Sequence, residues 1–295
     1  SSAASDVYKR QVDHWVTHHG IETTEAIAQS FLEPVKTTVR VNISRGSVDS
    51  IVAELEKEGF KVEKDEILPF CLHITGQPII NSRAFKDGYV SVQDKSSMMV
   101  AHIMNLGRND VVLDACSAPG GKACHMAEIL SPEGHVDATD IHTHKIDLIN
   151  FNIKKLKLDN ISAFQHDATE PYTRTYDKIL VDAPCSGLGV LRHKPEIKYT
   201  QSKESIQSLV ELQLQILENI KRNIKPGGTI VYSTCTIEQM ENENVIYTFL
   251  KQNEEFEFEP FQHPVTGKEV NTLQILPQDF DSDGFFITQI RRKES

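Results

Sequence analysis

Five short apolar segments that alternate with helical patterns constrain the fold of this chain more than any other feature. The segments cover residues 111–115, 134–139, 161–166, 176–181 and 229–233. Amphipathic spacing predicts helices over 122–130, 143–158, 202–224 and 238–252, and a last strand over 285–291. This alternation predicts a doubly wound, mostly parallel α/β sheet of the Rossmann-like kind.

Each of the five predicted strands ends at or near a polar or reactive side chain. These side chains are Cys116, Asp140, Asp167, Asp182 and Cys235. Carboxylates are seldom buried without partners, and doubly wound sheets bind their ligands at the carboxyl ends of the strands. The sequence therefore predicts a ligand site at this edge of the sheet.

The residues before this sheet predict two smaller parts. Residues 1–34 are expected to form a leader of about ten residues and a helical segment that breaks near Gly20 and ends at Pro34. Residues 35–95 combine a strand at 38–43, a helix at 47–59 and two strands around Pro69, which predicts a small α+β domain. The α/β domain is expected to occupy residues 96–295.

Composition excludes several classes of protein. Residues 237–284 hold eleven acids and two lysines, so this segment carries −9 of the net charge of −11 and leaves −2 for the rest. Composition therefore gives no support for RNA binding but does not exclude it. Five widely spaced cysteines without a CxxC pair predict neither a disulfide framework nor a metal site. No apolar run is long enough to cross a membrane and no secretory signal is present, which predicts a cytoplasmic location without a membrane partner.

The turn after the first strand of the α/β domain predicts the cofactor. Residues 114–122 read DACSAPGGK, in which Gly120 and Gly121 allow close approach of the backbone to a ligand. The GxGxxG pattern of dinucleotide sites is missing, and the GxxxxGK[ST] pattern of a P-loop fails at its first and last positions. S-adenosylmethionine carries no phosphate, so this looser turn suffices for it. Asp140 is expected at the ribose hydroxyls and Asp167 at the adenine amino group.

Two cysteines follow neighbouring strands and predict covalent chemistry. Cys185 follows the fourth strand within Asp-Ala-Pro-Cys, and Cys235 follows the fifth. A thiolate that adds to carbon 6 of cytosine turns carbon 5 into a nucleophile for a methyl group, and Asp182 is suited to bind ring nitrogen N3. Lys122 is expected to favour the thiolate. The spacing leaves open which cysteine attacks, although a Pro-Cys after the fourth strand favours Cys185.

Five segments together resemble the RsmB/Sun/NSUN family of RNA 5-methylcytosine methyltransferases. They are DGYVSVQDKSSM (87–98), DACSAPGGK (114–122), VDAPCSGLGVLRHKPEIKY (181–199), YSTCTIEQMENENVI (232–246) and DSDGFFITQI (281–290). They occur in the family's order and cover about residues 37–291. Within the family the chain is most similar to the bacterial RsmB branch, whose substrate is 16S ribosomal RNA. That branch carries an all-helical NusB-like domain before this region, whereas here about 35 residues precede it.

The resemblance implies a class I methyltransferase sheet, a catalytic residue set and a role for the small domain. It implies that Cys235 is the nucleophile, that Cys185 assists release of the methylated product, and that the small domain is RRM-like and faces RNA. It also implies which residues line the pocket of S-adenosylmethionine: Cys116, Ser117, Ala118, Pro119, Gly120, Gly121, Lys122, Asp140, Asp167 and Asp182.

Some further residues carry competing interpretations. His142 and His144 are expected to be solvated rather than to bind a metal, and Trp15 is expected to pack a helix rather than to stack on a base. The basic loop formed by Arg192, His193, Lys194 and Lys198 is expected to contact RNA phosphates. Residues 254–259 are expected to form a solvated strand edge or loop.

Two rival functions remain open from the sequence. The first is a tRNA or DNA cytosine methyltransferase with the same chemistry. The second is a ribosome-assembly factor that binds RNA and the cofactor without catalysis, against which the presence of Cys185, Cys235 and Asp182 argues. The sequence identifies neither the modified cytosine nor the oligomeric state.

Overall fold

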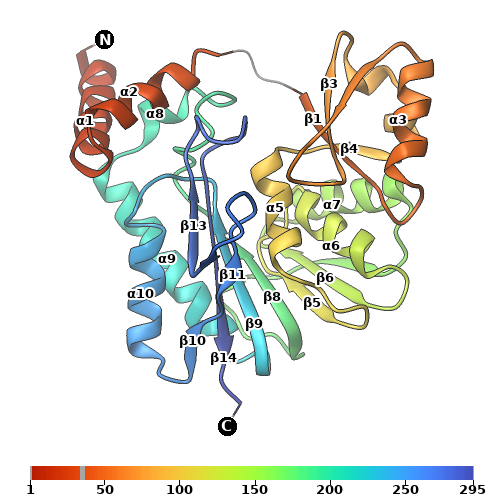
Figure 1. Cartoon of the computed structure of the whole chain (residues 1–295). Helices are drawn as coiled ribbons and strands as arrows, with labels where there is room; N and C mark the ends of the chain where they lie inside the picture. Colours follow the sequence, from red (N-terminus) through yellow and green to blue (C-terminus); the bar gives the residue numbers. More distant parts are fainter. Residues whose placement is uncertain (1, 34–36, 295) are drawn as a thin grey trace.

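The large sheet is built as the alternation of strands and helices predicts. In the computed structural model of the chain, residues 2–33 and 37–294 are described, so the predicted boundary at 34/35 and the helix end at Pro34 lie outside the described residues. The strands of this sheet follow the order β10-β14-β9-β8-β5-β6-β7, with β13 paired to β14 (Figure 1). Their bounds are β5 Val111–Asp114, β6 His135–Asp140, β7 Ile161–Gln165, β8 Tyr176–Asp182, β9 Ile224–Thr234, β10 Phe256–Phe258, β13 Thr272–Ile275 and β14 Phe285–Arg292.

The predicted mostly parallel character of this sheet is confirmed. The pairs among β5, β6, β7, β8 and β9 are parallel, and β14 joins β9 antiparallel. The order places β5 between β6 and β8, so the chain winds outward in one direction through β6 and β7 and in the other through β8 and β9. That reversal beside β5 is the topological switch point at which such sheets bind ligands.

Helices cover both faces of the large sheet because successive strand residues point to opposite sides. Val112, Leu180 and Val231 pack on one side with α5 (Lys95–Ile103), α6 (Gly121–Leu130) and α7 (Thr143–Leu156). Leu113 and Ile179 pack on the other side with α9 (Lys203–Ile220) and α10 (Glu243–Gln252). Figure 1 shows these two helical layers on either side of the strands.

The small sheet is separate and antiparallel, in the order β2-β3-β1-β4. It consists of β1 (Thr37–Val41), β2 (Lys61–Lys64), β3 (Cys71–Thr75) and β4 (Val90–Val92). α3 (Val48–Lys57) packs on one face and begins at Ser47, whose side chain accepts a hydrogen bond from the Ser50 amide. The turns before β4 are η1 (Ile79–Asn81) and α4 (Arg83–Lys86).

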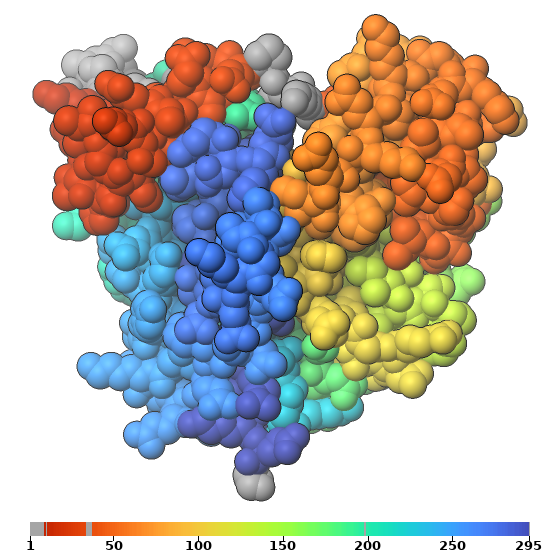
Figure 2. All heavy atoms as spheres, viewed as in Figure 1, coloured from red at the N-terminus to blue at the C-terminus, as the bar shows by residue number. Residues whose placement is uncertain are grey.

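Two helices at the start of the chain pack against loops of the large domain. α1 (Ser2–His19) and α2 (Ile21–Ser30) are separated at Gly20, as predicted. Trp15 is buried in one cluster with Leu188, Leu191 and Ile237. It therefore packs as expected and is not a stacking platform. In Figure 2 these helices and the small sheet stand on opposite sides of the same end of the molecule, with the segment before β14 between them.

Several predicted boundaries are wrong. α9 ends at Ile220, and the Lys-Pro-Gly-Gly run expected to stop it lies inside β9, where Ile224 already pairs with Tyr176. α10 begins at Glu243 rather than at residue 238. The prediction missed β11 (Phe261–Gln262), β12 (Glu269–Val270) and β13 because strands this short leave no clear alternation. A short helix, α8 (Ile197–Thr200), was also missed. Residues 254–259 contain the edge strand β10, as expected.

Within residues 2–33 and 37–294, no helix combines the length and the apolarity that crossing a bilayer requires.

Candidate active site

The turn that follows β5 is shaped by its glycines. Gly120 adopts a left-handed conformation with a φ of 98°, and a Cβ atom there would lie 3.1 Å from Ile149. The Ser117 amide donates to the Thr139 carbonyl at 2.7 Å, and the Gly120 amide donates to the Ser117 carbonyl at 2.7 Å. The turn thus lies against the end of β6 and leads directly into α6. Both the positive φ and the close approach require glycine.

Polar atoms without partners lie around this turn. Among the described residues, neither carboxylate oxygen of Asp114 has a hydrogen-bond partner, nor does the buried hydroxyl of Ser117. Complete burial and the nearby charge of Asp182 raise the pKa of Asp114 to about 7. Groups that are buried and unpaired in this way are costly unless a ligand satisfies them. The arrangement fits a cationic ligand without phosphate groups, such as S-adenosylmethionine.

The two carboxylates predicted to hold the nucleoside lie at adjacent strand ends. Asp140 is the last residue of β6; its Oδ1 accepts from the His142 amide at 3.1 Å and lies 3.7 Å from Lys145 Nζ. Asp167 follows β7 and accepts from the amide and hydroxyl of Thr169 at 2.9 and 2.7 Å. β6 and β7 pair in parallel, so both carboxylates lie at the same edge of the sheet.

Lys122 and Asp182 form an ion pair between α6 and the end of β8. Lys122 Nζ lies 2.8 Å from Asp182 Oδ2, and the Ser233 hydroxyl donates to Asp182 Oδ1 at 2.8 Å. Burial alone would lower the pKa of Lys122, but the charge and hydrogen bond of Asp182 outweigh it and raise that pKa. Lys122 therefore stays charged, and both carboxylate oxygens of Asp182 are held in place. Sequence reasoning did not include Ser233.

The two thiols predicted to share a pocket are in contact. The Sγ atoms of Cys185 and Cys235 lie 3.3 Å apart, because β8 and β9 are parallel neighbours. The hydrogen bond from Cys185 lowers the pKa of Cys235, against burial and the charge of Asp182, which raise it, and with help from Lys122 and Lys194. The same hydrogen bond, together with burial, raises the pKa of Cys185. Cys235 is therefore the thiol that ionises first.

A buried glutamate anchors both cysteine loops. The carboxylate of Glu241 accepts hydrogen bonds from the amide and hydroxyl of Ser186, next to Cys185. The carbonyl of Glu241 accepts from the Tyr232 hydroxyl in β9 at 2.6 Å. Glu241 lies in the acidic segment 237–284 and in the family-like segment 232–246, but no role was predicted for it, because a single sequence does not reveal such a long-range bond.

Two side chains of the basic loop after Cys185 have partners within the protein, and the contact of this loop with RNA phosphates stays a prediction. Arg192 donates through Nε to the Ser30 carbonyl at 3.0 Å and through Nη2 to the Pro277 carbonyl at 3.1 Å, so it joins α2 to the segment before β14. His193 pairs with Asp283 at 3.2 Å. Lys194 is exposed, whereas the side chain of Lys198 lies outside the described part of the structure.

The histidine pair predicted to be solvated is exposed. The rings of His142 and His144 stack with their centroids 5.5 Å apart at the start of α7. This agrees with the prediction of solvated positions at a helix start.

Family models identify both parts of the chain. A model described as 16S rRNA methyltransferase RsmB/F matches residues 101–291, which hold the glycine turn, the ion pair and both cysteines. The chain belongs to the RsmB/F methyltransferase family. A second model, described as the ferredoxin-like domain of RsmF/B-like methyltransferases, matches residues 11–80. The predicted family, the class I methyltransferase sheet with its preceding α+β domain, and S-adenosylmethionine as cofactor are confirmed.

Known proteins similar to this chain agree with the RsmB/F assignment. A probable ribosomal RNA small subunit methyltransferase B of Bacillus subtilis is 39% identical over 96% of this chain, which spans 65% of that relative. The solved structure of PH0851 superimposes with a TM-score of 0.89 at 28% identity, over 96% of this chain and 65% of that one. The structure of NSun6 from Pyrococcus horikoshii with SFG has a TM-score of 0.86 at 22% identity, over 96% and 98% of the two chains. The last shows the fold alone.

Proposed function

We propose that this RsmB/F-family protein methylates carbon 5 of a cytosine in RNA through a covalent adduct with Cys235. The contact between the sulfurs of Cys185 and Cys235, 3.3 Å apart, carries this proposal. A methyltransferase that acts on a nucleophilic nitrogen or oxygen needs no thiol. A pair in which one thiol stabilises the thiolate of the other supports addition to an unactivated ring carbon.

Residues around the two cysteines have separate roles in the proposed reaction. The thiolate of Cys235 attacks carbon 6 and forms a carbon–sulfur bond, while the ring electrons become available at carbon 5. Solvent supplies a proton to N3 as negative charge develops there, and the carboxylate of Asp182, oriented by Lys122 and Ser233, accepts the hydrogen bond from N3–H. S-adenosylmethionine, held at the Gly120–Gly121 turn, supplies the electrophilic methyl group.

Release of the product needs a proton acceptor and a leaving thiolate. After the methyl group is on carbon 5, a water molecule accepts the carbon-5 proton, and the electrons of that carbon–hydrogen bond form the double bond between carbons 5 and 6. The carbon–sulfur bond breaks to give back the Cys235 thiolate, and the proton on N3 returns to solvent, which restores the cytosine ring. Cys185 touches the sulfur of Cys235, so its hydrogen bond stabilises the departing thiolate. This position supports the role in release that the family resemblance implies for Cys185.

The proposed substrate is small-subunit ribosomal RNA. The names of the Bacillus subtilis relative and of the family model support this choice over tRNA and DNA. The target must be single-stranded or turned out of its helix, because the thiol cannot reach carbon 6 within a base stack. We also propose that the protein acts in the cytoplasm, where this RNA is found. We place the RNA-facing role on the small domain, residues 35–95.

The test is transfer of labelled methyl groups from S-adenosylmethionine to unmodified small-subunit rRNA, tRNA and DNA. We expect the wild type to label rRNA, Cys235→Ala to be inactive, and Cys185→Ala to accumulate a covalent protein–RNA adduct. Cys71→Ala is the matched control, because this buried free cysteine lies in β3 of the small sheet and not on the strands that carry the pair. An adduct in Cys235→Ala instead would reverse the two roles. RNA binding without methylation of any of the three acceptors would favour the assembly factor.

A further inference from the structure

Arg40 is a buried arginine on the small sheet that faces the catalytic domain. It lies in β1 between Val39 and Val41, whose side chains pack into the core under α3. Because strand residues alternate, Arg40 points from the opposite face of the sheet. Only 1% of the residue is exposed, so its charge must be satisfied by neighbours within the protein.

The guanidinium group of Arg40 is satisfied by three groups at once. Its Nε and Nη2 atoms donate to the two carboxylate oxygens of Glu128 in α6, each at 2.8 Å. Its Nη1 atom donates to the side-chain oxygen of Gln93 and, at 3.1 Å, to the carbonyl oxygen of Gly121. The fork geometry of arginine makes this combination of contacts possible, whereas a lysine ammonium has no such fork.

The contact with Gly121 lies at the turn that binds the methyl donor. Gly121 is the first residue of α6; it follows the left-handed Gly120 and precedes Lys122, which pairs with Asp182. The side chain of Gln93 lies 3.9 Å from the position that a Cβ atom on Gly121 would occupy. The side chains of Arg40 and Gln93 therefore both pack against the first residue of α6.

Stability alone does not require this charged arrangement. A buried ion pair is often no more stabilising than apolar side chains of similar volume, because both charges lose their hydration. A pair of methionines would fill the space of Arg40 and Glu128 but would remove the hydrogen bond that the Gly121 carbonyl accepts from outside its own helix. The carbonyl contact is therefore what distinguishes the arginine from an apolar filling.

We propose that Arg40 is a positioning residue that fixes the methyl-donor turn from the small sheet. It holds the backbone at Gly121 and, through it, the neighbouring Lys122. The small sheet thereby sets both the affinity for the cofactor and the ionisation of Cys235. This inference rests on cofactor binding at the turn and not on the identity of the methyl acceptor.

The first test is calorimetric binding of S-adenosylhomocysteine to the full chain. In Arg40→Met/Glu128→Met, which removes both buried charges, we expect an affinity about tenfold weaker, as for loss of one hydrogen bond to a charged group. The thermal midpoint should stay near that of the wild type. Arg40→Lys, which keeps one charge beside Glu128 but cannot make all three contacts, should weaken binding as well. This second variant covers the case in which the double variant does not fold.

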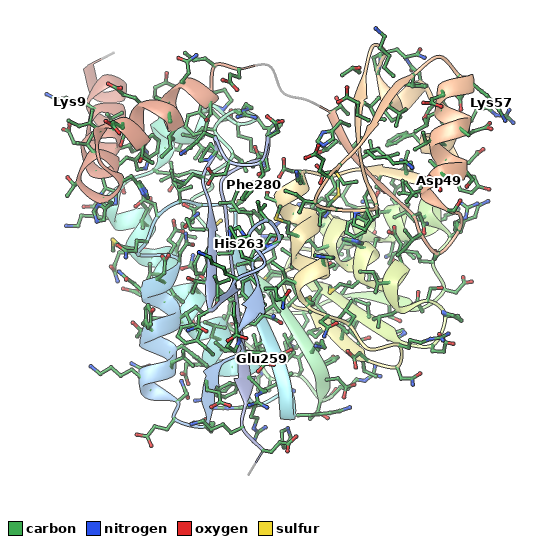
Figure 3. The ribbon with its side chains drawn as sticks, viewed as in Figure 1. Lys9, Asp49, Lys57, Glu259, His263 and Phe280 are labelled. Carbon is green, nitrogen blue, oxygen red and sulfur yellow. The ribbon has the colours of Figure 1, made fainter. Side chains whose placement is uncertain are left out.

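A second readout separates positioning from a structural role. If Lys122 shifts with Gly121, the alkylation of Cys235 by iodoacetamide will need a higher pH in both variants than in the wild type. The control is Lys64→Met, which breaks an exposed ion pair with Asp49 on the small domain; Figure 3 shows Asp49 and Lys57 on α3, away from the large sheet. It should change neither quantity.

Two results would overturn the positioning role of Arg40. A folded Arg40 variant that binds S-adenosylhomocysteine as tightly as the wild type would overturn the inference. So would weaker RNA binding with unchanged cofactor binding, which would assign Arg40 to the RNA-facing role alone. Because no methyl acceptor takes part in the calorimetry, failure of the cytosine proposal would leave this test intact.

Discussion

The ammonium group of Lys122 lies 2.8 Å from one carboxylate oxygen of Asp182 and close enough to Cys235 to favour its thiolate. The lysine comes from the methyl-donor turn, the aspartate from the end of β8 and the thiol from the end of β9. One cation thus joins the glycine turn after β5 to the two residues that we propose act on the base. The charge of Lys122 should therefore affect how readily the Cys235 thiol ionises.

Replacing Lys122 with methionine should make the Cys235 thiol harder to ionise. The hydrogen bond from Cys185 remains, but one of the positive charges that lower the pKa of Cys235 is lost and Asp182 is left unpaired. We expect the pH midpoint of iodoacetamide alkylation at Cys235, followed by mass spectrometry, to rise measurably above that of the wild type. Lys145→Met, beside Asp140, is the control. An unchanged midpoint would show that Lys122 does not act on the thiolate.

Replacing Asp114 with asparagine should stabilise the protein without cofactor at alkaline pH. The pKa of Asp114 is raised to about 7 by burial and by Asp182, so its ionised form is disfavoured in the folded state. The neutral carboxyl of Asp114 contributes fully to the stability of the fold below its pKa in the unfolded chain, near 4. This contribution is lost as the pH rises through the folded pKa of about 7. The free energies of unfolding of variant and wild type should agree at pH 4 and differ by on the order of 4 kcal/mol at pH 8. Parallel curves across this range would contradict the assignment.

The ion pair between His193 and Asp283 should weaken as the pH rises. The hydrogen bond with Asp283 raises the pKa of His193. A histidine whose pKa is higher in the folded protein stabilises the fold fully at pH values below its pKa in the unfolded chain, near 6.5. This contribution is lost as pH rises through the higher folded value. Because 41% of the side chain is exposed, we expect His193→Gln to cost less than about 1 kcal/mol at pH 5.5 and nothing at pH 9. Urea unfolding at both pH values checks this. A loss that is equal at the two would point to packing instead of charge.

Truncation of Trp15 should affect both stability and catalysis. The side chain fills the cluster that supports Leu188 and Leu191 after Cys185 and Ile237 after Cys235. We expect Trp15→Ala to lower the free energy of unfolding by about 3–5 kcal/mol, as for other buried aromatic truncations, and to reduce methyl transfer. Trp15→Phe should lose less, because the indole nitrogen has no partner among the described residues. A stable alanine variant with full activity would show that α1 does not support the cysteine loops.

Much of the fold was predictable because it depends on local patterns. The amphipathic spacing of 143–156 and the Ser47 cap of α3 are properties of neighbouring residues. The missed strands near residues 261–275 are too short for such a pattern. The 34/35 boundary of the predicted domains stays a prediction. Phe280, which Figure 3 shows between the β13 side of the large sheet and the small sheet, likewise has no local signal for its position.

The sequence by itself determined that Gly120 and Gly121 form a turn without phosphate-binding chemistry and that two cysteines follow neighbouring strands. Only the tertiary structure decided which thiol has the lower pKa, because that depends on how Cys185, Cys235 and Lys122 lie relative to one another. It also joined Arg40 to Glu128, which lie 88 residues apart. Alternation along a strand indicates which way a side chain points, but the partner it meets depends on how separately folded layers pack against each other.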